Sequence, residues 1–213
     1  MGAGGDTGAG TGGDAIMLAQ NNGRLTLNGS SSTFVRSDGF GGASQGSGQA
    51  GGAGTGGRSQ VFTLSTGQIA TTQFLNISSF GGGGSSVGGI GGVGRGGLGI
   101  LFTVDGRIDF TTASIAVDGD GGNGLTGGDG IAGFNTTGLV NQVNGGAFVS
   151  ARRGQIVGDA IFLSADGDGG SGQNGGAGGN GFGGEARGTA FNGSFIDDGV
   201  TADAPRLIDI DTI

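Results

Sequence analysis

The chain has 213 residues, of which 60 are glycine and one is proline, and it contains no cysteine, histidine, lysine, tryptophan or tyrosine. This much glycine without a strict three-residue period excludes collagen, and sparse charge with 33% hydrophobic residues in short runs argues against a disordered chain. The net charge of −8 argues against nucleic acid or an anionic membrane as a partner. No apolar run approaches the about 20 residues that span a bilayer, so we expect no membrane insertion.

A repeated pattern of short apolar runs and glycine-rich segments organises the chain. Its clearest copy is GRIDFTTASIAVDGDGG, residues 106–122, and related text occurs as GRLTLNGSSSTFVRSDGFGG, GQIATTQFLNISSFGGGG and GQIVGDAIFLSADGDGG. The glycine pairs that close the copies begin at Gly41, Gly81, Gly121 and Gly169, so the copies lie 40, 40 and 48 residues apart. A repeat of this length built from strands and turns is typical of a solenoid.

Each copy divides into three short strands with alternating apolar residues. The first strand is predicted over residues 14–20, 58–65, 98–104 and 185–191. A turn containing Asn, Asp or Thr before a glycine leads to a second strand, whose apolar residues are Leu25, Ile69, Ile108, Ile156 or Phe195. The third strand has two inward-facing residues in each copy: Val35 and Ser37, Leu75 and Ile77, Ile115 and Val117, and Leu163 and Ala165. The predicted core also includes Phe62, Phe102 and Phe110.

These strands predict an all-β chain that forms a single repeat domain over residues 1–213. A right-handed parallel β-helix (β-solenoid) of about four to five coils is the preferred fold, because equivalent strands then stack in register at about 4.8 Å. An antiparallel sandwich or propeller stays open, since Asn28-Gly29 and Asn192-Gly193 are typical hairpin turns. The predicted coils cover residues 13–42, 57–82, 97–122, 146–170 and 184–213.

Glycine-rich excursions connect the coils. Two interpretations are open: mobile loops, or polyproline-II-like strands stacked coil upon coil, where close backbones leave no room for a Cβ. Repetition of GGAGTGG, GGVGRGG, GGDGIAG and GGNGFGG at their ends favours the ordered interpretation. The third excursion holds an extra stretch, residues 134–146, that fits either a strand pair or a surface flap. The predicted excursions cover residues 43–56, 83–96, 123–145 and 171–183.

Paired aspartates close two of the copies. Asp118 and Asp120 form one pair, Asp166 and Asp168 form the other, and Asp38 stands at the matching place in the first copy. Side chains two residues apart in a strand point the same way, and clustered carboxylates suit Ca²⁺. These four paired aspartates are therefore candidate calcium ligands, and the sequence indicates no cofactor other than calcium. The competing interpretation is that Asp-Gly marks the turn out of a strand, where the carboxylate bonds to nearby backbone.

Few residues could support catalysis, and we expect that the protein is not an enzyme. Without His, Cys, Lys or Tyr, a polysaccharide-acting enzyme would depend on carboxylates such as Asp109 or Asp159, with Arg152 and Arg153 as substrate clamps. Solvated strand faces are the ordinary interpretation of these four residues.

An ice- or glycan-binding module is the alternative to a structural role. Its binding surface would be a flat face of small polar residues that orders water or sugar. The candidates for this face are Thr63, Thr103, Thr111 and Ser114.

The texts GRIDFTTASIAVDGDGGNG and GDAIFLSADGDGGSGQNGGAGGNGFGGEARGTA resemble the β-strand-repeat exoproteins of Gram-negative bacteria. Those proteins are broadly similar to filamentous-haemagglutinin and autotransporter passenger β-helices. The resemblance lies in the style of the repeat, covers nearly the whole chain and assigns no catalytic residue. It implies an extracellular or cell-surface structural and adhesive module. Such a module would associate with itself or with neighbouring coils of a longer chain, and with surface glycan or matrix. The glycine-rich first 13 residues resemble the end of an excursion, so we expect a fragment of a longer protein.

Overall fold

The computed structural model describes residues 7–29, 32–133, 145–191, 195–197 and 208–211. In these ranges the chain forms strands and turns without any helix, so no helix in them could cross a membrane. All strand pairings in the described part of the chain are parallel. The all-β prediction is confirmed, and the antiparallel sandwich or propeller is wrong.

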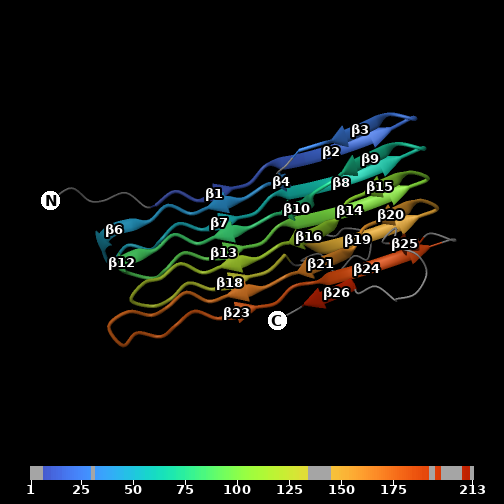
Figure 1. Ribbon diagram of the computed structural model, residues 1–213. Helices are drawn as coiled ribbons and strands as arrows, with labels where there is room; N and C mark the ends of the chain where they lie inside the picture. The colour runs from blue at the N-terminus through green and yellow to red at the C-terminus, as the bar shows by residue number, and fades with distance from the viewer. Residues whose placement is uncertain (1–6, 30–31, 134–144, 192–194, 198–207, 212–213) are drawn as a thin grey trace.

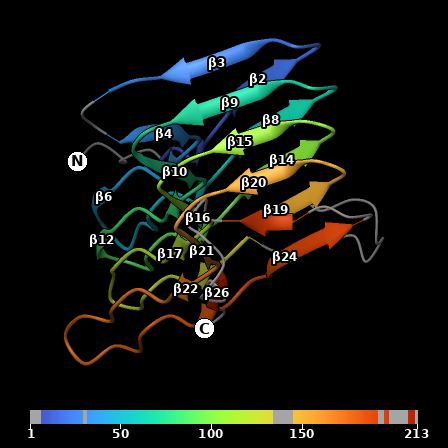
Figure 2. The same cartoon turned by 45° about the vertical axis from the view of Figure 1, so that its right-hand side comes forward.

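Three sheets form the body of the molecule, and each takes one strand from every repeat (Figure 1). The first sheet contains, in order, β2 (Asp14–Gln20), β8 (Arg58–Leu64), β14 (Leu98–Val104), β19 (Gly146–Arg152) and β24 (Ala186–Phe191). The second contains β3 (Arg24–Leu27), β9 (Gln68–Thr71), β15 (Arg107–Asp109), β20 (Gln155–Val157) and β25 (Phe195–Asp197). The third contains β4 (Thr33–Arg36), β10 (Phe74–Ser78), β16 (Thr112–Ala116), β21 (Ala160–Ser164) and β26 (Ile208–Asp211). Equivalent strands of successive repeats therefore lie one below another (Figure 2).

Glycine-rich arms extend from one side of this body (Figure 1). The outgoing arms contain β5 (Gly39–Phe40), β11 (Gly81–Gly82), β17 (Gly119–Asp120) and β22 (Gly167–Asp168), and farther out β6 (Ser44–Ser47) and β12 (Ser86–Gly88). The returning arms contain β1 (Gly10–Thr11), β7 (Gly54–Thr55), β13 (Gly94–Arg95), β18 (Gly130–Ile131) and β23 (Gly181–Phe182). Each arm stacks on its counterpart in the next repeat, as the body strands do.

Outgoing and returning arms are also bonded to each other across the layer between them. A chain of backbone N–H···O=C bonds of 2.8–2.9 Å alternates between the two sets of arms, from Gly42 N to Gly8 O up to Gly179 N to Gly170 O. The glycines between these ends are Gly52, Gly84, Gly92, Gly122 and Gly128. The two sets of arms therefore form one hydrogen-bonded slab.

Glycine is required in this slab because the backbones approach too closely for a side chain. A Cβ on Gly94 would lie 2.0 Å from the carbonyl oxygen of Asp120, and one on Gly128 would lie 2.1 Å from that of Gly92. Real Cβ atoms do not approach backbone oxygen so closely, so alanine at either position would push the arms apart.

The inward residues predicted for the third strands are confirmed. Val35 and Ser37 are 6% exposed, and the other six are at most 2% exposed. Those six are Leu75, Ile77, Ile115, Val117, Leu163 and Ala165.

Two phenylalanines of the first sheet point the other way from the prediction. Val61 and Leu101 are fully buried, so their neighbours Phe62 and Phe102 lie on the outer face, where they are half-buried. Phe110 is 7% exposed, as predicted for a core residue. In β8 both alternating sets contain large apolar residues, so a period of two could not indicate which set faces the core.

The turn between the first and second sheets agrees with its predicted composition in three of the four described copies, and in the fourth Arg153 precedes Gly154 with a φ of 54°. Its residues at positive φ include Asn21, Asn22, Thr66 and Asp105, with φ between 52° and 65°. Asn and Asp tolerate this left-handed conformation, and glycine follows Asn22, Thr66 and Asp105 directly.

The strand register corrects the repeat alignment. Paired strands place Gly39, Gly81, Gly119 and Gly167 at equivalent positions, so the true offsets are 42, 38 and 48 residues. The four consecutive glycines that begin at Gly81 allow either alignment from sequence alone. The extra stretch predicted at residues 134–146 lies mostly outside the described residues.

Candidate functional site

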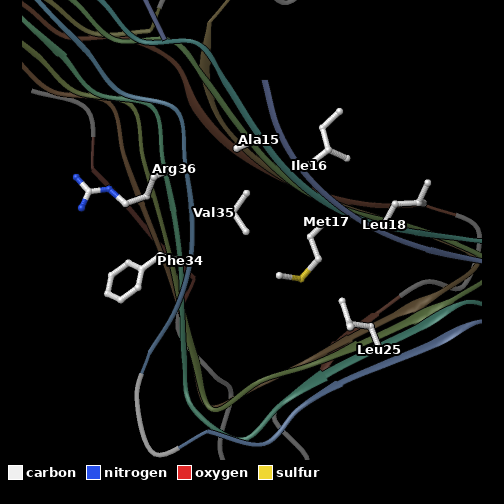
Figure 3. A pocket seen from close by; sticks show the side chains of 8 residues that line it. All are labelled: Ala15, Ile16, Met17, Leu18, Leu25, Phe34, Val35 and Arg36. Carbon is white, nitrogen blue, oxygen red and sulfur yellow. The ribbon is translucent and has the colours of Figure 1, made fainter. Parts of the chain in front are cut away.

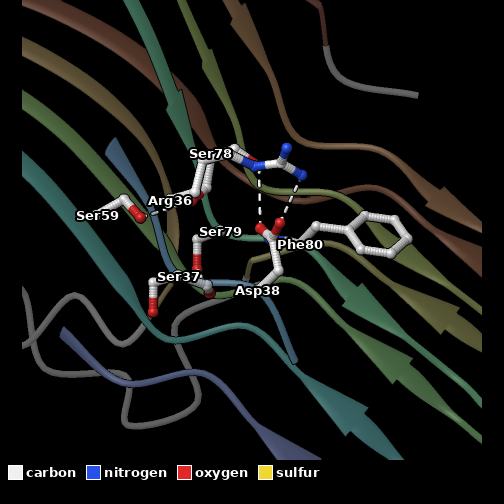
Figure 4. A network of polar contacts seen from close by, with 7 residues as sticks. All are labelled: Arg36, Ser37, Asp38, Ser59, Ser78, Ser79 and Phe80. Carbon is white, nitrogen blue, oxygen red and sulfur yellow. Dashed lines mark hydrogen bonds and ion pairs between the residues drawn. The ribbon is translucent and has the colours of Figure 1, made fainter. Parts of the chain in front are cut away.

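The exit from the third sheet holds a polar network that connects consecutive repeats (Figure 4). The carboxylate of Asp38 accepts hydrogen bonds from Ser78 Oγ at 3.2 Å and from the backbone N–H of Phe80 at 3.1 Å, both in the next repeat. Its other oxygen pairs with Arg36 Nη2 at 2.6 Å. Asp38 therefore joins two layers of the stack.

A carbonyl that leaves the strand ladder explains why a carboxylate is needed there. In a regular parallel ladder, the N–H of Phe80 would donate to the carbonyl of Ser37. That carbonyl instead accepts from Gly57 N of the returning arm, at 2.8 Å. The N–H of Phe80 would be left without a partner, and Asp38 supplies one.

The same arrangement recurs two repeats later. The carbonyl of Val117 accepts from Gly133 N at 2.9 Å, and Asp118 Oδ1 accepts from Asp166 N at 3.2 Å and from Ser164 Oγ at 2.7 Å. These contacts match the interpretation of Asp-Gly as a strand-exit signal, in which the carboxylate bonds to backbone. In the repeat between them, the equivalent residue is Phe80, which has no side-chain acceptor.

The second aspartate of each pair lies in the outgoing arm. Asp120 and Asp168 occupy equivalent positions in β17 and β22. Burial raises the pKa of Asp120 above its ordinary value of 3.8, and the negative charges of Asp168 and Asp118 raise it further. The column contains Phe40 and Gly82 in the first two repeats, so it carries carboxylates only in the later ones.

The register brings the four predicted calcium ligands together as two stacked pairs, Asp118 with Asp166 and Asp120 with Asp168. Asp166 Oδ1 is buried without a hydrogen-bond partner, while Asp118 Oδ1 already accepts two bonds. Among the described residues, no three acidic side chains are grouped so as to hold a metal ion. Calcium at these aspartates stays a prediction, and the contacts of Asp118 give that residue a structural role without a metal.

The polar face predicted for ice or glycan is not formed. Thr63 and Thr103 face the core, are fully buried and share a hydrogen bond of 2.7 Å between their hydroxyls. Thr111 is exposed, and Ser114 lies half-buried on β16. The prediction of one flat face was wrong because the odd-numbered residues of β8 and β14, which include Thr63 and Thr103, point into the core.

The residues named for the enzymatic alternative do not converge on a described cleft. Asp109 pairs with Arg107 at 2.6 Å, and Arg153 pairs with Asp105 at 2.9 Å. Arg152 is exposed at the end of β19, and Asp159 precedes β21.

The first layer of the body is uncovered at one end of the stack. β2, β3 and β4 are edge strands, and no described strand lies beyond them. Figure 3 shows Ala15, Met17, Leu25 and Val35 pointing into the hollow between these strands. Ile16, Leu18, Phe34 and Arg36, which complete the lining, point away from it. This end presents free backbone groups around an open apolar core.

A second surface was missed by the sequence analysis. The outer side of the first sheet has two central columns of side chains, Ile16, Gln60, Ile100 and Phe148 in one and Leu18, Phe62, Phe102 and Ser150 in the other. Ile16 is 56% and Leu18 is 41% exposed, and the others are half-buried. The signal in the sequence was that apolar residues fill both alternating sets of these strands.

Comparisons with models of protein families, with curated proteins and with solved structures found no match to this chain. The function is therefore proposed from the geometry and from the style of the repeat.

Proposed function

We propose that this chain is a structural and adhesive module of the bacterial cell surface or extracellular matrix, without enzymatic activity. In this proposal it is a right-handed parallel β-helix of four to five coils with polyproline-II-like glycine arms. Support comes from the parallel sheets in register, from the arm-to-arm hydrogen bonds and from the resemblance to bacterial β-strand-repeat exoproteins.

The observation that carries the proposal is the uncovered first layer. The backbone N–H of Gln68 in β9 donates to the carbonyl of Gly23, which directly precedes β3. The backbone N–H and C=O groups of odd-numbered residues in β3 therefore point toward β9. The N–H and C=O groups of Arg24 and Thr26 therefore point toward the open edge. An open edge of this kind is a template for another parallel strand.

The occupant that we propose for this edge is a further parallel layer, supplied by a neighbouring coil of a longer chain or, for the chain as given, by a second copy stacked end to end. Such a layer would continue all three body sheets and would cover the half-buried side chains of Met17 and Leu25. Covering an open apolar core is favourable by about 25 cal/mol for each Å² of apolar surface removed from water.

The test is an end-blocked variant that carries Met17→Lys and Thr26→Pro. Lysine places a charge in the open core, and proline removes one N–H from the free edge without breaking the ladder to β9. We expect the parent protein to form oligomers that lengthen with concentration, observed by sedimentation velocity and negative-stain electron microscopy. The end-blocked variant should form no such lengthening, end-to-end oligomers.

The matched control carries Met17→Leu and Thr26→Val, which keep apolar and β-branched character at the same two positions. It should assemble like the parent protein. End-to-end stacking is refuted if the parent never assembles end to end, or if the end-blocked variant assembles as well as the control.

A further inference from the structure

We infer that the outer side of the first sheet is a lateral docking surface for the same surface of a second copy of this chain. We call this surface the apolar face and define it by Ile16, Leu18, Phe62, Ile100, Phe102 and Phe148. It lies along the side of the stack, so it is separate from the end-to-end contact proposed above.

The composition of the apolar face selects an uncharged partner. Six of its eight column positions on β2, β8, β14 and β19 are large and apolar, and the other two, Gln60 and Ser150, are uncharged. Charged residues of the same side surround this centre: exposed Arg187 of β24 continues the first column, and exposed Asp14, Arg58 and Arg152 lie at the strand ends. Any charged group placed against the centre of this surface would lose its hydration without gaining a partner. A glycan would leave most of its hydroxyl groups without hydrogen-bond partners, so it is disfavoured as well.

The spacing of the columns on the apolar face favours another β-sheet as the docking partner. Its columns repeat at the strand spacing of about 4.8 Å, and a surface that matches this repeat over several strands is another sheet with the same spacing. Two such sheets pack face to face about 10 Å apart with their strands nearly aligned. A second copy of this chain presents the matching apolar columns at the matching interval.

The size of the apolar face predicts how strong the contact is. The four strands have seven residues each. At about 3.3 Å per residue and about 4.8 Å per strand, the whole outer side of these four strands outlines about 440 Å², and the apolar face is the central part of that area. A stable dimer contact covers about 800 Å² on each partner, so two single modules should pair weakly and reversibly. Copies stacked end to end would present several such faces in a row, and their weak contacts would add up.

The experiment measures lateral pairing where end-to-end stacking is blocked. Sedimentation equilibrium of the end-blocked variant should show a monomer–dimer equilibrium that depends on concentration. Adding Phe62→Gln and Phe102→Gln should weaken this pairing at least about tenfold. The control is Phe162→Gln, which changes a 44% exposed phenylalanine on the outer side of the third sheet. It should leave pairing unchanged.

A cross-link in the otherwise unchanged protein keeps the inference testable if a variant fails to fold. The chain has no cysteine, so Gln60→Cys places a single thiol on the apolar face, and Ser114→Cys places one on the outer side of the third sheet. A bis-maleimide that spans about 10 Å should link pairs of the first protein and not of the second. The inference is overturned if the end-blocked variant stays monomeric at all concentrations, if the double glutamine variant pairs like its control, or if both cysteine variants cross-link equally. End-to-end stacking is scored separately by the parent protein, so either proposal can fail alone.

Discussion

Asp118 shows how one side chain can join two layers of the stack. Its Oδ1 accepts from the backbone of Asp166 and the hydroxyl of Ser164, in place of a carbonyl that bonds to the returning arm. The physical need is a hydrogen-bond acceptor at that position, and a negative charge is not required. Substitutions of Asp118 that keep an acceptor oxygen and those that remove it should therefore differ in their effect on stability.

We expect Asp118→Ala to lower the free energy of unfolding by about 1–2 kcal/mol, because it leaves the N–H of Asp166 without a partner. Asp118→Asn keeps an acceptor oxygen and removes a charge beside Asp166, so it should keep the stability of the parent protein. Chemical denaturation with each variant measures the difference. Equal losses for alanine and asparagine would contradict the hydrogen-bond account. The calcium prediction has its own test: a metal at these aspartates predicts that a chelator lowers the parent's melting midpoint, and an unchanged midpoint would contradict it.

Asp120 gives the stack a dependence on pH. Burial and the charges of Asp168 and Asp118 raise its pKa in the folded protein above the ordinary value of 3.8. The folded state therefore holds the proton more tightly than the unfolded state, so this group favours folding in acid and loses that contribution as the pH rises through the folded pKa. Asp120→Asn should be more stable than the parent protein at neutral pH, and the difference should vanish below about pH 3.8.

NMR titration of the Asp120 carboxyl carbon tests the cause directly. Asp168→Asn removes one of the two neighbouring charges, so it should lower the pKa of Asp120. A pKa that stays unchanged in that variant would show that Asp168 does not contribute.

At the scale of the element, the glycine arm is a strand whose sequence is set by backbone contact. Gly178 and Gly179 are adjacent in one returning arm but differ in their surroundings. A Cβ on Gly179 would lie 2.0 Å from the carbonyl oxygen of Gly128, whereas the nearest atom to one on Gly178 is 3.5 Å away. The two positions form a natural matched pair.

We expect Gly179→Ala to lower the free energy of unfolding by about 3 kcal/mol, because the arms must separate to admit the methyl group. Gly178→Ala should change it by less than about 0.5 kcal/mol. Thermal melting followed by circular dichroism compares the two variants. Similar losses at both positions would contradict the close packing of the arms.

The strands also show how much of the fold could be predicted from the sequence alone. The ranges 14–20 and 98–104 were predicted in full, and 58–65 was one residue too long, because each follows glycine-rich text and alternates clearly. The inner and outer sides of β8 could not be assigned, because Val61 and Phe62 belong to different sets and both are apolar. The register at Gly81 could not be fixed either, since consecutive glycines carry no side chain that marks the alignment.

The candidate site was predicted only in part for a related reason. The sequence predicted the paired aspartates as calcium ligands, with Asp38 at the matching place, but the contacts of Asp38 and Asp118 depend on the carbonyls of Ser37 and Val117 turning toward the arms. Such a turn is a property of the stacked layers and leaves no pattern in the sequence. The open end and the apolar face likewise depend on which strands are neighbours.

At the scale of the whole molecule, the parallel layers repeat along one axis, which is the axis of the stack. Every described strand runs across the stack, and each new layer repeats the hydrogen bonds of the last. In our proposals, a further layer adds to the uncovered end along this axis, and a second copy pairs with the apolar face beside it. A structural module would use the first contact to extend and the second to bundle.

The most direct measurement of the central claim is X-ray diffraction from aligned assemblies of the purified protein. End-to-end stacking predicts filaments with a reflection near 4.8 Å along the filament axis, because the layers of strands repeat in that direction. Filaments with that reflection perpendicular to the axis, or a protein that forms no filaments at any concentration, would contradict the account.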